Sequence, residues 1–439
     1  MKRGKRILLA ISCVVLLGLS WLAAVTAKTD AQRQEELIAQ AAAYVEDEIY
    51  IRAVPLLEEA AAYEDARTLD AEEALKNVYL HLIEKSGYTQ KYTSLLEKQM
   101  NRKDAAPQVF QEAAEYYLAK GQTGTAITIL RTGAEQTGSP ELTELYEANR
   151  YVYELGRDFY QEVTAIYNGS AQVKQEGYWG LADRRGSLVI PCEYDWISTY
   201  SGDRAIVQKD GVISAVDADN NRVALFHGSA SEFTNFGENR LALHTPEGWL
   251  VAGGELHTGS MPLEEIGMYS NGCAAAKLDG KWGLLSPDGT EWTLAPQYDG
   301  IVQDELGRSF DQEAVFVRSG DQVLLLVKGE QTGGIYEDAQ PFNGGWAAVK
   351  QNGKWGFIDT EGTVQIDFRF QNALSFGGHL AAVETEDGWG YIDLHGKLVI
   401  SPEFLEAKSF YKGSAPVKTA DGWRFLTLTE YEEGAGGLL

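Results

Sequence analysis

The sequence predicts a multi-domain chain in which an α-helical region is followed by an all-β array of repeated hairpins. Three observations support this prediction. Residues 7–27 carry no charged side chain. Apolar residues then recur at helical spacings of three and four as far as about residue 168. Beyond that point, a tryptophan that opens a short apolar run returns about every 34 residues.

The uncharged run predicts how the chain meets a membrane. Residues 1–6 form a basic, cytoplasmic tail, and the run 7–27 is long enough to span a bilayer as one helix. We therefore expect a transmembrane anchor at the cell membrane, with the bulk of the chain outside the cytoplasm. A signal peptide is the alternative, because residues 25–27 resemble a cleavage site, and cleavage near Ala27 would release a secreted protein.

The net charge restricts the possible partners. The formal charge at pH 7 is −26, and the charged residues among the first six are all basic, so the rest of the chain is even more acidic. A surface of this kind repels the phosphates of nucleic acids. We expect no nucleic-acid partner.

Residues 28–168 are predicted as a helical domain of repeated helix pairs. Gly121 is followed by Ala126 and Gly133, at offsets where small residues let two short helices cross closely. The same offsets recur at positions 48, 53 and 60, and again at positions 87, 92 and 99. This pattern predicts stacked helical hairpins.

The spacing of these helix pairs resembles that of tetratricopeptide repeats, which stack into a curved groove. The resemblance implies binding of a peptide or protein in that groove. Glu48, Tyr92 and Gln99 stand where the pattern favours glycine or a small residue. An ordinary helical bundle or stalk is therefore the alternative.

Residues 169–429 are predicted as eight copies of one β unit, followed by a flexible acidic and glycine-rich tail at residues 430–439. Six copies begin one strand with a tryptophan, and the other two carry Val212 or Val323 in its place. Successive copies lie 32 to 41 residues apart. The six tryptophans are Trp179, Trp249, Trp282, Trp355, Trp389 and Trp423.

Each copy is predicted to form a hairpin that is apolar on both faces. Asp-Gly or Asn-Gly pairs, which favour tight turns, stand at 210–211, 279–280, 352–353, 387–388 and 421–422. We expect the tryptophan to fill the space between successive hairpins. We expect the glycine after it to let a neighbouring backbone approach or bulge. These glycines are Gly180, Gly283, Gly356 and Gly390.

The repeated stretch resembles the WG-repeat (KWG-repeat) family over about residues 170–428. The family's mark is the motif K-W-G-apolar-apolar-D-x-x-G, followed by P-x-[YF]-[DE]. The second element stands here at residues 191–195, 296–299 and 402–405. Eight such units suit a β-propeller-like ring, in which a strand before Trp179 joins a strand after Trp423, or an open β-solenoid.

No catalytic or metal-binding constellation emerges from the spacing of reactive residues. The six histidines lack ligand spacing, and residues 217–221 lack the glycine and glutamate of a calcium loop. An aspartate recurs after the apolar pair, and we expect its side chain to accept hydrogen bonds from the amides of its own turn. The four aspartates are Asp183, Asp217, Asp359 and Asp393. We expect no catalytic residue, cofactor or metal.

Two of the three cysteines fall in the predicted β region. Cys192 and Cys273 lie in apolar contexts without CxxC spacing. They are expected to be small core side chains, and the sequence leaves open whether they form a disulfide.

These features favour a non-enzymatic scaffold or binding protein of the cell envelope, whose repeat surfaces bind a protein or a wall polymer. The alternative is a carbohydrate- or ligand-binding, or hydrolytic, β-propeller. For that alternative, three tryptophans outside the repeat motif are candidate exposed ligand contacts: Trp196, Trp292 and Trp346.

Overall fold

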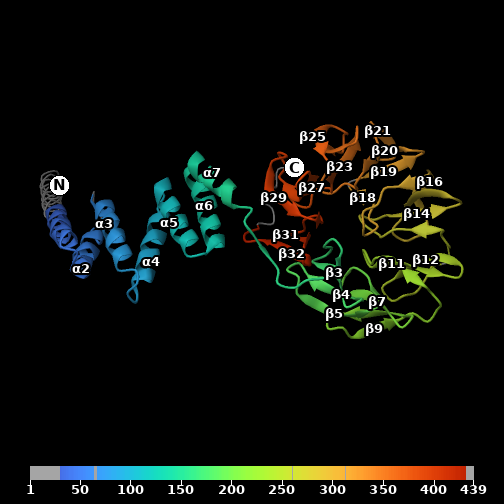
Figure 1. Cartoon of the computed structure of the whole chain (residues 1–439), viewed down its shortest axis with the longest axis horizontal. Coiled ribbons are helices and arrows are strands. Elements are labelled where there is room, and N and C mark those ends of the chain that lie inside the picture. The colour runs from blue at the N-terminus through green and yellow to red at the C-terminus, as the bar shows by residue number, and fades with distance from the viewer. Residues whose placement is uncertain (1–29, 64–66, 260, 312, 432–439) are drawn as a thin grey trace, which may run out of the picture. The chain divides into compact units, whose positions relative to one another are not determined.

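A computed structural model describes residues 30–63, 67–259, 261–311 and 313–431 (Figure 1). The predicted cytoplasmic tail, the predicted membrane segment 7–27 and residues 432–439 of the predicted tail lie outside these ranges. Within the described ranges, no helix combines the length and apolar character that crossing a membrane requires. The chain separates into two units between residues 148 and 149.

The boundary between the two units corrects the prediction that the helical domain ends at residue 168. Strands β1 (Tyr153–Leu155) and β2 (Glu162–Val163) precede that residue and pair with strands of the second unit. Strands of two or three residues are too short to show the alternation of a β-strand. Their distant partners, and not their own sequence, place them in the β unit.

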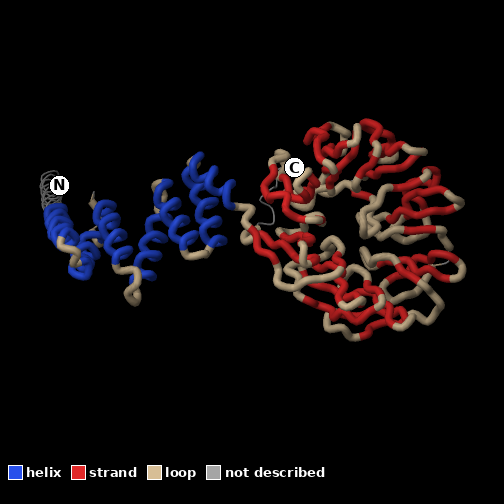
Figure 2. Tube along the Cα trace, viewed as in Figure 1, coloured by secondary structure: helices blue, strands red, loops and turns tan. Residues whose placement is uncertain are grey.

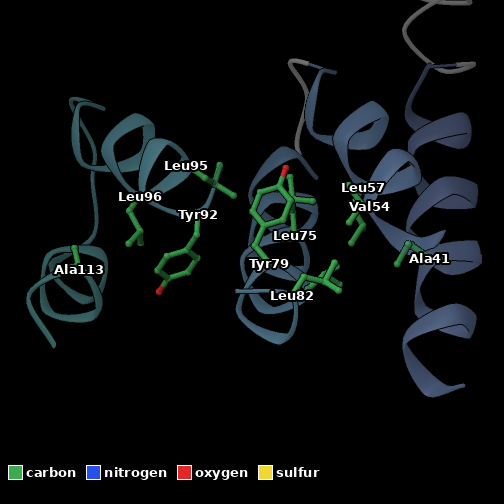
Figure 3. Close-up of a cluster of buried hydrophobic side chains, with 12 residues drawn as sticks. Ala41, Val54, Leu57, Leu75, Tyr79, Leu82, Tyr92, Leu95, Leu96 and Ala113 are labelled. Carbon is green, nitrogen blue, oxygen red and sulfur yellow. The ribbon is translucent and has the colours of Figure 1, made fainter. Parts of the chain in front are cut away.

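The first unit is a succession of helices, each packed against the next (Figure 2). A helix at residues 30–46 is followed by α2 (Tyr50–Ala61), α3 (Thr68–His81), α4 (Tyr88–Met100), α5 (Pro107–Ala119), α6 (Thr123–Thr137) and α7 (Pro140–Asn149). Proline opens α5 and α7, where its fixed φ suits the first turn and no amide donor is needed. One apolar cluster runs through five successive helices, from Ala41 to Ala113 (Figure 3).

The turns within the three helix pairs share one backbone feature. Glu48, Gly87 and Gly121 have positive φ angles of 59°, 86° and 71°, and each precedes the second helix of its pair. An ideal Cβ on Gly133 would lie 2.6 Å from Cγ of Phe110, so glycine is what lets α6 pack this closely on α5. The other positions at offsets 5 and 12 are all buried: Ala53, Ala60, Tyr92, Gln99 and Ala126.

The two large residues at these offsets take part in a buried polar network. Gln99 donates to the Glu72 carboxylate over 3.1 Å, and Tyr92 donates to Glu112 over 3.2 Å. Glu72 is fully buried, and its carboxylate also forms ion pairs with Arg102 at 2.7 Å and Lys98 at 3.0 Å. Polar contacts of this kind, made between successive helices, explain why larger side chains occupy positions where small ones would otherwise pack.

The second unit is a ring of eight antiparallel sheets, called blades 1 to 8 in chain order (Figure 1). Blade 1 contains β2, β3 (Ser170–Gln175), β4 (Tyr178–Asp183) and β5 (Leu188–Tyr194). Blade 2 contains β6 (Trp196–Ile197), β7 (Arg204–Lys209), β8 (Val212–Asp217) and β9 (Arg222–Leu225). Blade 3 contains β10 (Glu232–Phe233), β11 (Arg240–Thr245) and β12 (Gly248–Gly253). Blade 4 contains β13 (Glu265–Ile266), β14 (Ala274–Leu278), β15 (Lys281–Leu285) and β16 (Trp292–Tyr298).

The remaining blades follow the same order of strands. Blade 5 contains β17 (Gly300–Ile301), β18 (Phe310–Asp311), β19 (Ala314–Ser319), β20 (Gln322–Val327) and β21 (Glu330–Tyr336). Blade 6 contains β22 (Asp338–Ala339), β23 (Trp346–Gln351), β24 (Lys354–Asp359) and β25 (Val364–Phe370). Blade 7 contains β26 (Asn372–Ala373), β27 (Ala381–Thr385), β28 (Gly388–Ile392) and β29 (Leu398–Phe404). Blade 8 contains β30 (Glu406–Ala407), β31 (Ser414–Thr419), β32 (Gly422–Leu428) and β1.

The two ends of the β unit close the ring within blade 8. β1 pairs antiparallel with β32, with Tyr153 opposite Leu428 and Leu155 opposite Leu426. A strand from the start of the unit therefore completes the last blade, as predicted for a ring, and the open solenoid is excluded. The closing strand is residues 153–155, which precede the predicted start of the β domain.

The register corrects two details of the predicted repeat. Ile213, and not Val212, stands in the tryptophan position of blade 2, because it pairs with Gln208 as Trp179 pairs with Lys174. The turns predicted at 387–388 and 421–422 are also shifted by one residue. Their glycines already pair within the strands, and the two-residue loops are 386–387 and 420–421.

Candidate functional site

The repeated tryptophan lies at the same place in the sheet of each blade that carries it. Trp355 on β24 pairs with Lys350 on β23 and with Phe370 on β25. Lysine also lies opposite Trp179, Trp282 and Trp423, and an aromatic ring on the fourth strand opposes Trp179, Trp282 and Trp389. Trp179, Trp355, Trp389 and Trp423 are buried, whereas Trp249 and Trp282 are half-buried. These rings are packed into the blades.

The glycine after the tryptophan makes room for a bulge in the fourth strand. An ideal Cβ on Gly356 would lie 2.7 Å from the carbonyl oxygen of Ile366, and the register shifts at this point. The corresponding distances to the neighbouring carbonyl oxygen are 2.5 Å at Gly180, 2.4 Å at Gly283 and 2.6 Å at Gly390. These are closer than a real Cβ can approach a backbone atom. Glycine is therefore a steric requirement of this blade geometry.

Two tryptophans lack a following glycine, and the strand pairing beside them differs from that of the other blades. Trp249 lies in blade 3, where isolated bridges at Thr258 and Leu263 replace the fourth strand. Trp423 lies in blade 8, where Leu155 of β1 lies opposite Leu426 and Tyr160 lies opposite Trp423, so two extra residues stand in the partner segment. Arg424, which follows Trp423, donates from Nε to the carbonyl oxygen of Gly156 at 2.8 Å, so a large side chain is accommodated there.

The repeated aspartates hold their own turns, as predicted. Oδ1 of Asp183 accepts hydrogen bonds from the amides of Arg185 at 2.8 Å and Ser187 at 2.9 Å. Asp217, Asp359 and Asp393 each accept from the amides two and four residues ahead, over 2.8 to 3.0 Å. Carboxylates bound in this way organise turns.

The three remaining tryptophans lie on strands and are half-buried, which corrects the expectation of exposed rings. Trp196 on β6 packs edge-on against Trp179, with ring centroids 4.8 Å apart. Trp346 on β23 packs edge-on against Phe376 at 5.3 Å, and Trp292 packs against the apolar cluster of blades 3 and 4. Because they lie in different blades, they do not form one aromatic platform for a sugar.

The cysteines are free thiols in different blades. Cys192 lies on β5 of blade 1, and Cys273 directly precedes β14 of blade 4. Burial raises the pKa of both thiols. The two thiols therefore do not form a disulfide, and their raised pKa favours the neutral form.

The inner loops of the blades form a cavity that the sequence did not reveal. An inner loop joins the first and second strands of a blade. The loops of blades 4 to 8 surround a space of about 60 Å³. A buried water needs roughly 10–15 Å³, so the cavity can hold several waters or the polar end of a ligand. Its lining residues are Ser270, Asn271, Asp304, Arg308, Asp311, Gln340, Pro341, Phe342, Asn343, Ser375 and Ser409.

The charged groups of the cavity are already engaged with protein partners. Arg308 binds Asp304 through Nε at 2.7 Å and through its second nitrogen at 2.6 Å, and Asn271 donates to Asp311 at 3.1 Å. Within the described residues, the side chains of Gln340 and Asn343 make no protein hydrogen bond. The site therefore offers neutral amide donors and acceptors beside the charged groups.

The described residues around the cavity include no metal-binding cluster. Across the described residues, no group of three or more His, Cys, Asp or Glu side chains is placed to hold a metal ion. The signal that could have pointed to the cavity was the interval of 41 residues between Trp282 and Val323, the longest in the repeat. Its extra residues belong to the inner loop of blade 5, which supplies Asp304, Arg308 and Asp311.

Comparison with known proteins identifies the repeat. The family described as "WG containing repeat" matches residues 179–212, 263–282, 334–355, 355–388 and 389–423. These five segments fall in blades 1, 2 and 4 to 8, so WG repeats occur between residues 179 and 423, as the motif predicted, and residues 213–262 and 283–333 are not matched. The match does not extend to the helical unit, where the tetratricopeptide resemblance stays a prediction. No curated protein matches the chain.

The chain is also similar to solved structures at low sequence identity. A crystal structure of a eukaryotic initiation factor has a TM-score of 0.39 and 12% identity, covering 59% of this chain and 82% of that one. KlHsv2, with its loop 6CD replaced by a Gly-Ser linker, has a TM-score of 0.35 and 8% identity, covering 64% and 97%. The β-propeller domain of Cps50 (Swd1) from Myceliophteria thermophila has a TM-score of 0.33 and 12% identity, covering 63% and 99%. Scores and identities this low carry no conclusion about function.

Proposed function

We propose that the protein is a non-enzymatic scaffold or binding protein of the cell envelope, which presents its repeat surfaces to a protein or a wall polymer. The main support is how the repeated residues are used. The tryptophans pack, the glycines make room for backbone, and the aspartates hold turns. None of these positions offers a reactive group, and the repeat thus serves to build a surface.

Binding by such a surface has a measurable signature. Immobilised full-length protein should capture a protein or wall polymer from envelope extract, and the purified partner should then bind saturably. Because the contacts are spread over a surface, removal of single acidic side chains should weaken binding only slightly. Glycosidase, esterase and peptidase substrates provide the opposing test. Turnover abolished by one Asp→Asn change would contradict the proposal.

The envelope location rests on the uncharged run 7–27 behind a basic tail. Full-length protein should sediment with membranes from the producing cells and resist extraction by high salt. A soluble species that begins at Lys28 would show instead that the run is a cleaved signal peptide.

The central cavity favours a second candidate function, the binding of a small neutral polar ligand such as a sugar. Gln340 and Asn343 point to this function because their amides are not engaged by the protein. A glycan array should then show a ligand whose affinity falls at least tenfold when both residues are changed to alanine. The exposed Gln297 on β16 provides the matched control, Gln297→Ala, which should leave affinity unchanged. Equal binding by all three proteins would rule out the cavity as the site.

A further inference from the structure

The inner loop of blade 5 is about twice as long as the others. Twelve residues, 302–313, separate β17 from β19, whereas six or seven separate the corresponding strands of every other blade. The added residues are not needed to continue the sheet. They include β18, which pairs with β19 on the inner side of the blade (Figure 1).

The tip of this loop repeats the turn that ends the tryptophan strand. Asp304 donates its amide to the carbonyl oxygen of Arg308 at 2.9 Å, and Gly307 donates to the carbonyl oxygen of Asp304 at 3.0 Å. Oδ1 of Asp304 accepts from the amides of Leu306 at 3.0 Å and Arg308 at 2.9 Å. Asp183 makes the same four kinds of contact in blade 1. The loop tip is thus a turn closed by its own hydrogen bonds.

This turn is bound to the inner loops of blades 3 and 4. Asn235 of blade 3 donates to the carbonyl oxygen of Leu306 at 3.1 Å. The backbone amide of Met268 in blade 4 donates to the carbonyl oxygen of Gly307 at 2.9 Å. The contact with blade 4 is close, because an ideal Cβ on Gly267 would lie 2.5 Å from the Gly307 oxygen. Leu306 is buried against Met268.

Glu305, at the tip of the loop, reaches the two blades where the ring closes. Its Oε1 accepts the backbone amide of Ala165 in blade 1 at 2.5 Å, and its Oε2 forms an ion pair with Lys408 of blade 8. Lys408 also lies 5.1 Å above the ring of Trp423. In a ring of eight blades, blade 5 is opposite blade 1, so these contacts cross the centre.

We infer that residues 302–311 form a central plug, and that Glu305 of this plug links the last blade to the first across the seam between them. The ring is then closed twice. The β1–β32 pairing closes it within blade 8, and the contacts of Glu305 with Ala165 and Lys408 close it at the centre. Asp304, Arg308 and Asp311 of the plug also line the cavity. The contacts of Glu305 with Ala165 and Lys408 therefore fix the position of one cavity wall.

Amide hydrogen exchange of the full-length protein tests whether Glu305 stabilises the seam between blades 8 and 1. Glu305→Ala removes both contacts, and exchange should rise at least fivefold in the seam segments 160–167 and 406–414. Exchange in the remote segment 346–359 of blade 6 should not change. Glu305→Gln keeps an oxygen for the Ala165 amide and loses the charge opposite Lys408, so its effect should be intermediate. This milder variant also covers the case in which Glu305→Ala does not fold.

The control is Glu313→Ala, at the other end of the same loop. Glu313 pairs with Lys328 at 3.1 Å, and both side chains are exposed and belong to blade 5. This variant should leave exchange in the seam segments unchanged. The inference is overturned if Glu305 variants leave the seam unchanged, if exchange rises equally in blade 6, or if Glu313→Ala has the same effect.

Discussion

Trp355 on β24 and Phe370 on β25 lie opposite each other, although the register between their strands shifts at Gly356. The bulge places the carbonyl oxygen of Ile366 next to Gly356, and it leaves Phe370 directly opposite Trp355. The WG pair and the aromatic residue that follows it are therefore two halves of one packing unit. The glycine admits the bulge that places the tryptophan and this aromatic residue opposite each other.

Adding one methyl group at Gly356 should destabilise the ring. In Gly356→Ala the new Cβ would lie 2.7 Å from a backbone oxygen that cannot rotate away. We expect a loss of ~1–3 kcal/mol in the free energy of unfolding, measured by chemical denaturation. Gly253→Ala is the matched control, because its Cβ would meet only one atom within 4 Å, at 3.9 Å. Equal losses for both variants would contradict the steric role of Gly356.

Removing the buried tryptophan should cost more than removing an exposed aromatic residue. Trp355→Ala leaves a cavity in the core of blade 6 and should lose about 3–5 kcal/mol. Tyr178→Ala, on the exposed side of β4, should lose roughly 0.5 kcal/mol or less. Trp196→Ala should fall between them, because Trp196 is half-buried against Trp179. Similar small losses for Trp355→Ala and Tyr178→Ala would show that the repeated ring is not structural.

The helical unit should lose stability as the pH falls through the folded-state pKa of Glu72. Burial opposes ionisation of Glu72, but hydrogen bonds from Lys98, Gln99 and Arg102 outweigh it and hold its pKa below the ordinary 4.5. A lowered pKa contributes stability above the unfolded value, and that contribution disappears below the folded one.

The variant Glu72→Gln isolates this contribution. At pH 7 it should unfold with a free energy about 1–3 kcal/mol lower than that of the wild type, as followed by helical circular dichroism. The difference should shrink as the pH falls below 4.5. Glu59→Gln removes a half-exposed carboxylate paired with Arg33 at 3.6 Å, and should change little at either pH. A difference for Glu72→Gln that is independent of pH would contradict the proposed role of its charge.

The turn aspartate should matter through its oxygen and not through its charge. Asp393→Ala leaves the amides of His395 and Lys397 without their acceptor and should cost roughly 1 kcal/mol in thermal or chemical unfolding. Asp393→Asn keeps an acceptor oxygen and should recover most of that loss. Asp387→Ala, in an exposed loop of the same blade, provides the control and should be nearly neutral. If Asp393→Asn does not recover the lost stability, the charge of Asp393, and not its oxygen, would be what stabilises the turn.

The sequence alone determined the features that depend on neighbours along the chain. The recurring tryptophan showed that one unit is repeated, because each copy must bury the same large ring. Asp-Gly and Asn-Gly pairs placed the turns at 210–211, 279–280 and 352–353, since these residues adopt the positive φ that such turns require. The aspartate that opens a turn was assigned correctly for the same reason: its hydrogen bonds reach only two and four residues ahead.

Only the tertiary structure decided the features that depend on distant partners. β1 is three residues long and becomes a strand because β32 offers it an unpaired edge. Trp196 and Trp346 are half-buried because other residues of the ring cover one side of each. The sequence signal for the plug was the interval of 41 residues between Trp282 and Val323, which is longer than the other intervals of the repeat. Glu305 lies between Ala165 and Lys408 because eight blades close into a ring. Closure brings the first and last blades together, and blade 5 lies across the centre from them.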